Sequence, residues 1–469
     1  MPAGPAWPAG WRPVHGAAVR KVAAVTPLPD SLQAQLERRV RQVQRDARIP
    51  GIAAGLMQAG RLTWSAGVGA ADVEAPEDPP TADTAFAIGS ISKTFTAVLV
   101  MMLRDQGKLA LGDRLGDHLA GHRHEAITLR ELLAHASGLQ REAPGDAWDT
   151  LILPSPGDLV AGLDDAEQVL PSRLRWHYSN LAYSLLGEVV ARAGGQPWEQ
   201  AVQDRLLGPL GMTRTSLAPA PPRAAGYFTE PFTDQVRREP WPDLKAFAPA
   251  GGLWSTVGDL ARWAAFLTDG ADGVLAASTI DEMTRPEIMA DLEAWTNAAG
   301  LGLQLFRSGE RVLAGHAGGM PGFLTGLAVR RSDRTAAVVL TNTSAGADAI
   351  GLAIELVGTV LDACPPDPAP WRPGPPVPAA LAPLTGRWWS EGSGFTLSVR
   401  DGRLEARADA APLARPPAVF EPDGADRFRT VSGREQGELL LVERAPDGRV
   451  TRLRWAGYPF TRQPQTFGG

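Results

Sequence analysis

A proline-dense stretch divides this chain of 469 residues into two parts that must fold separately. The stretch reads CPPDPAPWRPGPPVPAALAP and spans residues 364–383. Each proline fixes its own φ angle and lacks a backbone N–H donor, so a run this dense can form neither a helix nor a central strand. We therefore expect a linker here, with one domain before it at residues 31–363 and a second after it at residues 384–469.

The part before the linker mixes helical and strand patterns. Apolar residues at helical spacing predict a first helix that ends before Pro50, and two short strands around Gly60 follow it. A further helix is predicted from Ser90 to about Gln106. The remaining patterns are helical at 127–134, 179–193, 197–207 and 257–268, strand-like at 301–319 and 322–343, and helical at 345–363. Strands at both ends with helices between them predict an α/β domain whose sheet is completed by its two ends.

The part after the linker has the period of β-strands. Apolar and polar residues alternate there around two turn signals, Asp401-Gly402 and Asp447-Gly448. We expect a small antiparallel β domain.

The first 30 residues predict an irregular segment. They are rich in Pro, Gly and Ala and lack the continuous apolar run of a signal peptide, which is about 7–15 residues long. The longest apolar run in the chain, at 94–103, is interrupted by Arg104 and Asp105 and is too short for a membrane helix. We therefore expect a cytoplasmic protein with no transmembrane segment.

Charge and cysteine content restrict the possible partners. The formal net charge is -6 and no basic run is present, so nothing in the sequence favours nucleic acid or an anionic membrane surface. The single cysteine, Cys364, allows no intrachain disulfide and no thiolate metal cluster. A small-molecule substrate is the expected partner, and the sequence does not indicate an oligomeric state.

The segment AIGSISKTFTAV (87–98) holds the chain's main chemical signal. It places Ser90 three positions before Lys93, and Lys93 is one of only four lysines among 46 basic residues. If a helix begins at Ser90, the two side chains share one face and the amine can approach the hydroxyl. A buried lysine can lose its proton and act as a base, whereas arginine cannot. The pair therefore predicts a nucleophilic serine with a lysine base.

Two further motifs follow in the same chain. WHYSNLAYSLLGEVV contains a Tyr-x-Asn element at 178–180, and AGHAGGMPGF spans 314–323. Together with Ser-x-x-Lys, these motifs resemble the serine β-lactamase and penicillin-binding-protein superfamily, in particular its class C-like branch, which includes family VIII esterases and D-aminopeptidases. The resemblance covers roughly residues 31–362, and several segments between the motifs are similar as well.

The resemblance implies a role for each motif residue. Ser90 would be the acylated nucleophile, Lys93 and Tyr178 would share or relay its proton, and Asn180 would hydrogen-bond the acyl side of the substrate. A phenol near an ammonium group can serve as a phenolate or as a proton relay.

The third motif departs from the family pattern. Where the family has Lys-Thr-Gly, this chain has His316 before Gly318 and Gly319, which we expect to contact the substrate together with His316. The oxyanion hole implied by the resemblance is formed by the backbone N–H groups of Ser90 and Gly319. A histidine is neutral much of the time near pH 7, so the cation that usually meets a substrate carboxylate is missing. An ester, an amide or an amino-terminal D-residue is therefore favoured over penicillin-like substrates.

The resemblance also implies a fold. It is an α/β, more strictly α+β, β-lactamase-like fold with an antiparallel sheet flanked by helices and an all-helical subdomain. The C-terminal β domain is similar to small lipocalin-like barrels that follow the hydrolase domain in several relatives.

A metal site is a competing interpretation of one segment. His118, His122, His124 and Glu125 gather in DHLAGHRHE, and His135 follows shortly after. No His-Glu-x-x-His motif is present, so a surface loop is the favoured interpretation, and no metal or cofactor is expected.

Two competing interpretations concern the class of protein. An α/β-hydrolase requires Gly-x-Ser-x-Gly, and Ser90 is followed by Ile91 and Ser92, so that template fails. A non-catalytic binding or assembly protein could keep the fold without turnover, but the retention of Lys93 in a chain that otherwise prefers arginine argues against it. The sequence predicts a serine hydrolase that cleaves a small ester or amide through an acyl-enzyme, most simply an esterase. A D-aminopeptidase, a D-stereospecific amidase or a weak β-lactamase is the alternative within the same family.

Overall fold

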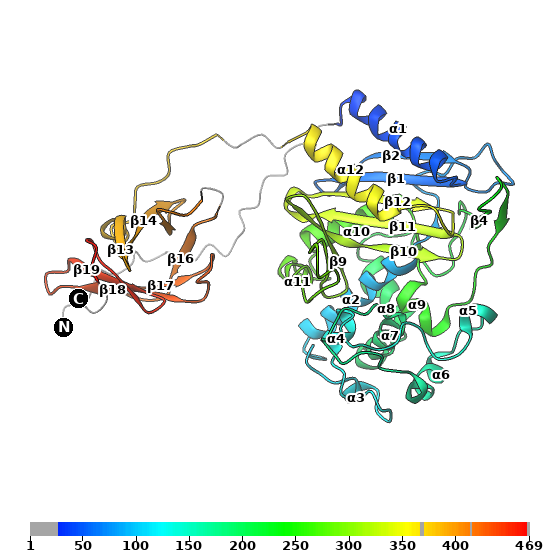
Figure 1. The fold of residues 1–469 in the computed structure, drawn as a ribbon, viewed down its shortest axis with the longest axis horizontal. Coiled ribbons are helices and arrows are strands. Elements are labelled where there is room, and N and C mark those ends of the chain that lie inside the picture. Colours follow the sequence, from blue (N-terminus) through cyan, green and yellow to red (C-terminus); the bar gives the residue numbers. More distant parts are fainter. Residues whose placement is uncertain (1–26, 366–369, 413–414, 467–469) are drawn as a thin grey trace. The chain divides into compact units, whose positions relative to one another are not determined.

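The computed structural model describes residues 27–365, 370–412 and 415–466. These residues belong to two compact units, one within Val22–Pro366 and one within Asp367–Gly469. Figure 1 labels helices and strands of each unit. Most of the irregular segment predicted at residues 1–30 lies outside the described residues, and the first helix begins at Asp30.

The α-helices all lie in the first unit, as far as the described residues extend. They are α1 (Asp30–Asp46), α2 (Ser92–Asp105), α3 (Leu115–His118), α4 (Leu129–Leu133), α5 (Ala147–Thr150), α6 (Pro156–Ala161), α7 (Asn180–Gly194), α8 (Trp198–Val202), α9 (Ala248–Gly251), α10 (Val257–Asp269), α11 (Ala277–Met283) and α12 (Ala349–Ala363).

The strands of the first unit are β1 (Gly51–Gln58), β2 (Arg61–Gly69), β3 (Phe86–Ala87), β4 (Tyr227–Thr229), β5 (Val236–Arg238), β6 (Trp254–Ser255), β7 (Ile288–Met289), β8 (Asn297–Ala299), β9 (Gln304–Ser308), β10 (Arg311–Met320), β11 (Phe323–Arg330) and β12 (Thr335–Thr341). The strands of the second unit are β13 (Gly386–Ser390), β14 (Ser393–Arg400), β15 (Arg403–Ala408), β16 (Ala418–Pro422), β17 (Arg427–Thr430), β18 (Leu439–Arg444), β19 (Val450–Trp455) and β20 (Tyr458–Phe460).

An antiparallel sheet forms the centre of the first unit. Its strand order is β2-β1-β12-β11-β10-β9-β8-β7, so the first hairpin of the unit pairs with its last long strand. The pairing runs from Ile52 opposite Thr341 to Gln58 opposite Thr335. The prediction that the sheet is completed by both ends of the domain is therefore confirmed, and β10, which carries the third motif, lies inside the sheet.

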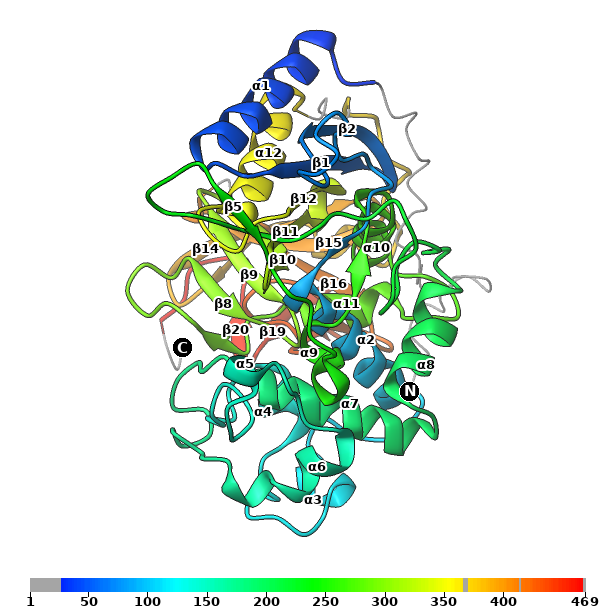
Figure 2. The same ribbon diagram turned by 90° about the vertical axis from the view of Figure 1, so that its right-hand side faces the viewer.

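Helices cover both faces of this sheet (Figures 1 and 2). On one face α1 and α12 pack together, and Leu36 and Val40 of α1 share a core with Ile52 of β1 and Val357 of α12. The other face packs against α10 and α2, which belong to the larger core of the unit. The apolar spacing of α1 thus corresponds to the face that it buries.

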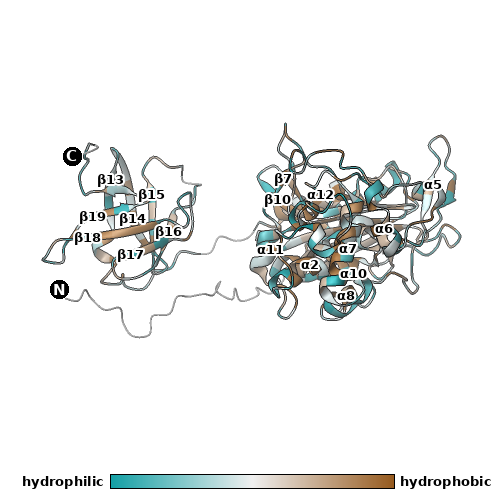
Figure 3. Cartoon of the chain, turned by 90° about the horizontal axis from the view of Figure 1, so that it is seen from below, coloured by the Kyte–Doolittle hydropathy of each residue, from teal (hydrophilic) through white to brown (hydrophobic). Residues whose placement is uncertain are grey.

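A helical region lies below the sheet in Figure 1 and comprises α3 to α8. Between this region and the sheet runs α2 (Figure 1), which Figure 3 colours by hydropathy. Its residues from Ser92 to Leu103 are all buried. The α-helix begins at Ser92 and not at Ser90, because a short 3₁₀ turn, η1 (Gly89–Ile91), precedes it. The nucleophile candidate therefore lies on a tight turn at the entrance to a deeply buried helix.

The second unit is an antiparallel sheet of strands in sequence order, from β13 to β20. A bridge between Trp389 and Thr461 brings its two ends together, so the sheet approaches a closed barrel. Trp388 and Trp455 are buried in its core. At the predicted turn after β14, Asp401 and Gly402 both have positive φ, as a tight hairpin turn requires. The prediction of a small antiparallel β domain is confirmed.

Within the residues that the structure describes, no helix is both long and apolar enough to cross a membrane.

Candidate active site

Ser90 and Lys93 are brought together as the sequence predicts. Ser90 lies in the η1 turn, and Lys93 lies in the first turn of α2. The Lys93 Nζ atom is 3.0 Å from the Ser90 Oγ atom. A spacing of three residues thus places the amine within hydrogen-bond distance of the hydroxyl. The backbone at Ser90 is 3₁₀ and not α-helical, but the two side chains still meet.

Lys93 is fully buried and has two further partners. Its Nζ atom donates to the Asn180 Oδ1 atom at 2.7 Å and to the Ala250 carbonyl oxygen of α9 at 2.6 Å. Burial lowers the pKa of Lys93 well below its ordinary value; the charge of Glu142 opposes this shift and the charge of Arg141 adds to it. The environment therefore favours the neutral amine, which is the form that can accept a proton.

Asn180 connects Lys93 to a loop that no sequence motif marks. The N–H groups of Asn180 and Leu181 donate to the Arg141 carbonyl oxygen, which ties the loop to the start of α7. The Asn180 Nδ2 atom donates to Glu142 Oε1 at 2.5 Å. Because a carboxylate only accepts hydrogen bonds, this contact fixes the amide so that its oxygen faces Lys93.

Tyr178 lies beside this group and presents its ring face to cations. Lys93 Nζ is 5.0 Å from the centre of the ring, and the Arg141 guanidinium carbon is 5.1 Å from it. Burial of the phenol raises the pKa of Tyr178 above its ordinary value, and interactions with the Ser90 hydroxyl and with Arg141 act in the opposite direction. The phenol therefore keeps its proton, so of the two roles open to it a proton relay fits better than a phenolate.

His316 lies on β10 and is buried. Its Nδ1 atom is 2.5 Å from the Ala317 carbonyl oxygen, and its ring centre is 6.1 Å from that of Tyr178. Burial lowers the pKa of His316 to about 3. A neutral imidazole then donates from Nδ1 to the carbonyl and leaves Nε2 unprotonated.

Gly318 lets β10 approach the turn that carries Ser90. A Cβ atom at Gly318 would lie 2.1 Å from the Ile88 carbonyl oxygen and 2.1 Å from Thr325 Oγ1. Gly89, which precedes Ser90, has a φ of 51° and its own Cβ would lie 2.6 Å from the Gly319 nitrogen. Larger residues at these two positions would separate the strand from the turn that carries Ser90.

The direction of the Gly319 N–H group follows from the strand geometry. The Ala317 N–H donates to the Gln304 side chain, on the side of β10 opposite to its partner β11. Backbone N–H groups two residues apart in a strand point the same way, so the Gly319 N–H also points away from β11. This is the side on which Gly89 and Ser90 approach the strand.

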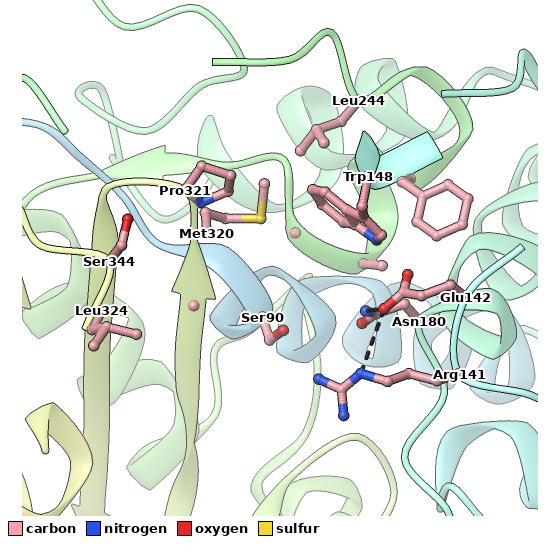
Figure 4. A pocket seen from close by; sticks show the side chains of 14 residues that line it. Ser90, Arg141, Glu142, Trp148, Asn180, Leu244, Met320, Pro321, Leu324 and Ser344 are labelled. Carbon is pink, nitrogen blue, oxygen red and sulfur yellow. Dashed lines mark hydrogen bonds and ion pairs between the residues drawn. The ribbon is translucent and has the colours of Figure 1, made fainter. Parts of the chain in front are cut away.

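A cavity of about 410 Å³ lies beside the turn that carries Ser90, and of the predicted site residues Ser90, Asn180 and Gly319 line it (Figure 4). In that view Ser90 lies between Leu324 and Ser344 on one side and Arg141, Glu142 and Asn180 on the other. The sequence did not identify most of the remaining lining, which is largely apolar and comprises Trp148, Leu244, Phe247, Ala250, Gly251, Gly319, Met320 and Pro321. Several of these residues come from loops without a periodic pattern, so no sequence signal marked them.

The histidines considered as metal ligands have other roles. His118 Nε2 pairs with Asp113 at 3.1 Å, and His124 Nε2 contacts the Ala166 carbonyl oxygen at 2.9 Å. His135 lies beside Tyr178, apart from the others. In the ranges 27–365, 370–412 and 415–466, no group of three or more His, Cys, Asp or Glu side chains is arranged to hold a metal ion.

Comparison with known proteins places this geometry in a family. Residues 36–358 match the family model named Beta-lactamase, and residues 377–462 match a domain of unknown function, DUF7586. Penicillin-binding protein 4 of Amycolatopsis lactamdurans is 31% identical over 338 residues, which are 66% of this chain and 86% of that protein.

Two further similarities differ in how much they cover. Beta-lactamase-like protein 2 of Dictyostelium discoideum is 29% identical over 264 residues, which are 53% of this chain, so the chain spans about half (47%) of that protein's length. A D-stereospecific amidohydrolase from Streptomyces sp., known from a crystal structure, is 26% identical with a TM-score of 0.59, and the similarity covers 71% of this chain and 98% of that one.

Proposed function

The chain belongs to the β-lactamase family of serine hydrolases and penicillin-binding proteins, and from this premise we propose that it cleaves a small ester or amide through a covalent acyl-enzyme on Ser90. The observation that carries the proposal is the arrangement of partners around Lys93. The two shortest contacts of its Nζ atom go to the Asn180 Oδ1 and Ala250 carbonyl oxygens, which only accept hydrogen bonds. A neutral amine has two N–H donors and one lone pair, so both donors are used and the lone pair faces Ser90 Oγ, the partner that can donate.

The first chemical step follows from this orientation. Ser90 Oγ attacks the substrate carbonyl carbon while its proton passes to Lys93 Nζ, and the carbonyl oxygen becomes an oxyanion. The backbone N–H groups of Ser90 and Gly319 are the proposed donors to this oxyanion. The orientation of the Gly319 N–H toward the nucleophile turn supports its part.

The leaving group needs a proton when its bond to the acyl carbon breaks. Tyr178 is the proposed donor, because its raised pKa keeps the phenol protonated and its hydroxyl interacts with that of Ser90, beside which the leaving group departs. Lys93 can then return the proton that it took from Ser90 to Tyr178. In the second half of the cycle water attacks the acyl-enzyme, its proton follows the same route, and the acid is released with Ser90 restored.

The volume of the cavity and part of its lining support a small acyl group. Its volume of about 410 Å³ suits a small molecule, and Trp148, Leu244 and Phe247 give part of it an apolar wall. A neutral His316 supplies no cation for a substrate carboxylate, and the guanidinium of Arg141 in the cavity lining is already paired with Glu142. These features favour an esterase over an enzyme acting on penicillin-like or D-alanyl-D-alanine substrates.

One observation favours a second candidate within the same chemistry. Glu142 lines the cavity, and its Oε2 atom is buried without a hydrogen-bond partner among the described residues. A carboxylate oxygen in this state would be satisfied by an ammonium group on the substrate. The second candidate is therefore an amidase or aminopeptidase that takes a D-aminoacyl substrate with a free amine, and the similarity to a D-stereospecific amidohydrolase supports it.

The proposed function is tested by hydrolysis of p-nitrophenyl butyrate with the wild-type protein and the Ser90→Ala variant. Activity in the wild type alone supports the nucleophile and the esterase candidate. Equal activity in both would overturn the assignment of Ser90. No activity in either protein would exclude the simple esterase candidate. The remaining candidates would be an enzyme acting on D-aminoacyl substrates and a binding protein that keeps the fold.

The second candidate has its own test. Hydrolysis of D-alanine p-nitroanilide should fall about 10-fold or more in Glu142→Gln, because one charge-assisted hydrogen bond is lost, whereas butyrate hydrolysis should change little. Glutamine keeps an oxygen for the Asn180 amide, so the orientation of Asn180 and Lys93 is retained. An equal loss on both substrates would show that Glu142 acts on Asn180 and not on a substrate amine.

A further inference from the structure

His135 has a backbone conformation that calls for an explanation. It follows α4 with a φ of 54°, in the left-handed region, and only 4% of it is exposed. Most residues other than glycine are disfavoured there, but histidine is among those better tolerated, and a left-handed residue commonly ends a helix. His135 takes no part in the reaction steps proposed for Ser90, Lys93 and Tyr178.

His135 forms hydrogen bonds with both sequence neighbours of Tyr178. Its carbonyl oxygen accepts the N–H of His177 at 2.8 Å. Its Nδ1 atom accepts the N–H of Ser179 at 3.1 Å. The two residues on either side of Tyr178 are therefore both held by one histidine, through its main chain and its side chain.

The ring of His135 also contacts the ring of Tyr178 directly. The two ring centres are 4.3 Å apart with planes 26° from parallel, which is a stacked pair. The ring of Tyr183 lies 5.0 Å away, and the Tyr183 hydroxyl donates to the Leu133 carbonyl oxygen at 2.7 Å. Tyr183, which is held by its hydrogen bond to α4, therefore packs against the His135 imidazole. The imidazole in turn packs against Tyr178.

The hydrogen bond to Ser179 determines the protonation of the imidazole. Because Nδ1 is an acceptor, the proton of the neutral ring lies on Nε2, which has no partner among the described residues. Burial lowers the pKa of His135 well below its ordinary value, and the permanent charge of Arg141 acts in the same direction. The ring thus stays neutral and keeps its acceptor over the pH range in which the enzyme is expected to work.

We propose that His135 is a positioning residue that holds the phenol of Tyr178 in place for proton transfer between Lys93 and the leaving group. The proposal rests on the proposed function, because it assumes that Tyr178 transfers a proton in that reaction. It assigns His135 no contact with the substrate. Its geometric basis is the pair of backbone hydrogen bonds on both sides of Tyr178 and the stacked ring between Tyr178 and Tyr183.

The test uses two variants, one without and one with a side-chain acceptor for the Ser179 N–H group. His135→Gly accepts a positive φ without strain and keeps the carbonyl contact, but it loses the acceptor and the ring. His135→Asn also tolerates this φ and places an oxygen where Nδ1 was, so it restores the acceptor for Ser179. We expect kcat for p-nitrophenyl butyrate to fall about 10- to 100-fold in His135→Gly with little change in KM, and to recover largely in His135→Asn.

A double-mutant cycle separates positioning from general stability. If His135 acts through Tyr178, then Tyr178→Phe combined with His135→Gly is no slower than Tyr178→Phe alone. His124→Asn, another buried histidine with a backbone partner, serves as the matched control and should keep kcat. Should His135→Gly fail to fold, His135→Asn, which tolerates this φ but lacks the ring, replaces it in the cycle, and any loss that it causes must likewise vanish in the Tyr178→Phe background.

The outcomes distinguish this inference from the function on which it rests. Multiplicative losses in the double mutant, a rise in KM with unchanged kcat, or no recovery in His135→Asn would each overturn the positioning role. Full activity in Tyr178→Phe would instead overturn the proposed role of Tyr178, and with it this inference. Full activity in Ser90→Ala would overturn the proposed function itself.

Discussion

Replacement of Lys93 by arginine removes the proposed base and leaves a permanent cation in its place. Lys93 is fully buried, with the Ser90, Asn180 and Ala250 oxygens around its Nζ atom. A guanidinium does not lose its proton in a protein, so it cannot accept the Ser90 proton. Loss of a positioned general base reduces rates by roughly 10²- to 10⁴-fold, which corresponds to about 3–5 kcal/mol of transition-state stabilisation. We expect kcat/KM for p-nitrophenyl butyrate to fall by this factor in Lys93→Arg.

The same substitution should also lower stability. The surroundings of Lys93 lower its pKa and so favour an uncharged side chain, whereas Lys93→Arg must bury a permanent charge. A buried charge without a partner costs about 3–5 kcal/mol. Lys93→Met is the matched control, because it removes the base without adding a charge and should be as inactive but melt at a higher temperature than Lys93→Arg. If Lys93→Arg keeps more than about a tenth of wild-type kcat/KM, the assignment of Lys93 as the base is wrong.

Two further predictions concern the strand beside the nucleophile. His316 has a pKa of about 3 when folded and about 6.5 when unfolded, so the unfolded chain binds more protons between these values and stability rises with pH across this window. In His316→Gln the pH dependence of urea unfolding should lose up to about 1.4 kcal/mol per pH unit there, and an unchanged slope would contradict the neutral histidine. Gly318→Ala would place a methyl group 2.1 Å from the Ile88 carbonyl oxygen, so its kcat should fall sharply, whereas Gly112→Ala, with no atom within 4 Å of its added Cβ, should match the wild type in the same assay.

Two features of the first domain could be predicted from the sequence, because each depends on residue patterns that can be recognised within short segments. The Ser-x-x-Lys spacing predicts a contact between neighbouring turns, and the observed distance of 3.0 Å confirms it. The strand patterns at both ends predict a shared sheet, and β1 does pair with β12. The predicted start of the helix is two residues early, because the tight 3₁₀ turn at Gly89–Ile91 has the same apolar pattern as the α-helix that follows.

The contacts in the site between segments far apart in the chain could not be predicted from the sequence. Ala250 contributes only a backbone carbonyl oxygen, which leaves no mark on residue identity. Glu142 reaches Asn180 because the loop before it binds the start of α7, a contact between segments that have no shared periodicity. His135 was considered only as a possible metal ligand, since its position under Tyr178 depends on how two distant loops pack.

The proposed reaction requires that Ser90 becomes acylated during turnover. Intact-mass measurement of the protein, quenched in acid during hydrolysis of p-nitrophenyl butyrate, detects this intermediate. We expect a species heavier by one butyryl group, mapped by digestion to the peptide that contains Ser90 and absent from Ser90→Ala. Turnover by the wild-type protein with a butyryl group on another residue, or an adduct that persists in Ser90→Ala, would contradict the acyl-enzyme at Ser90.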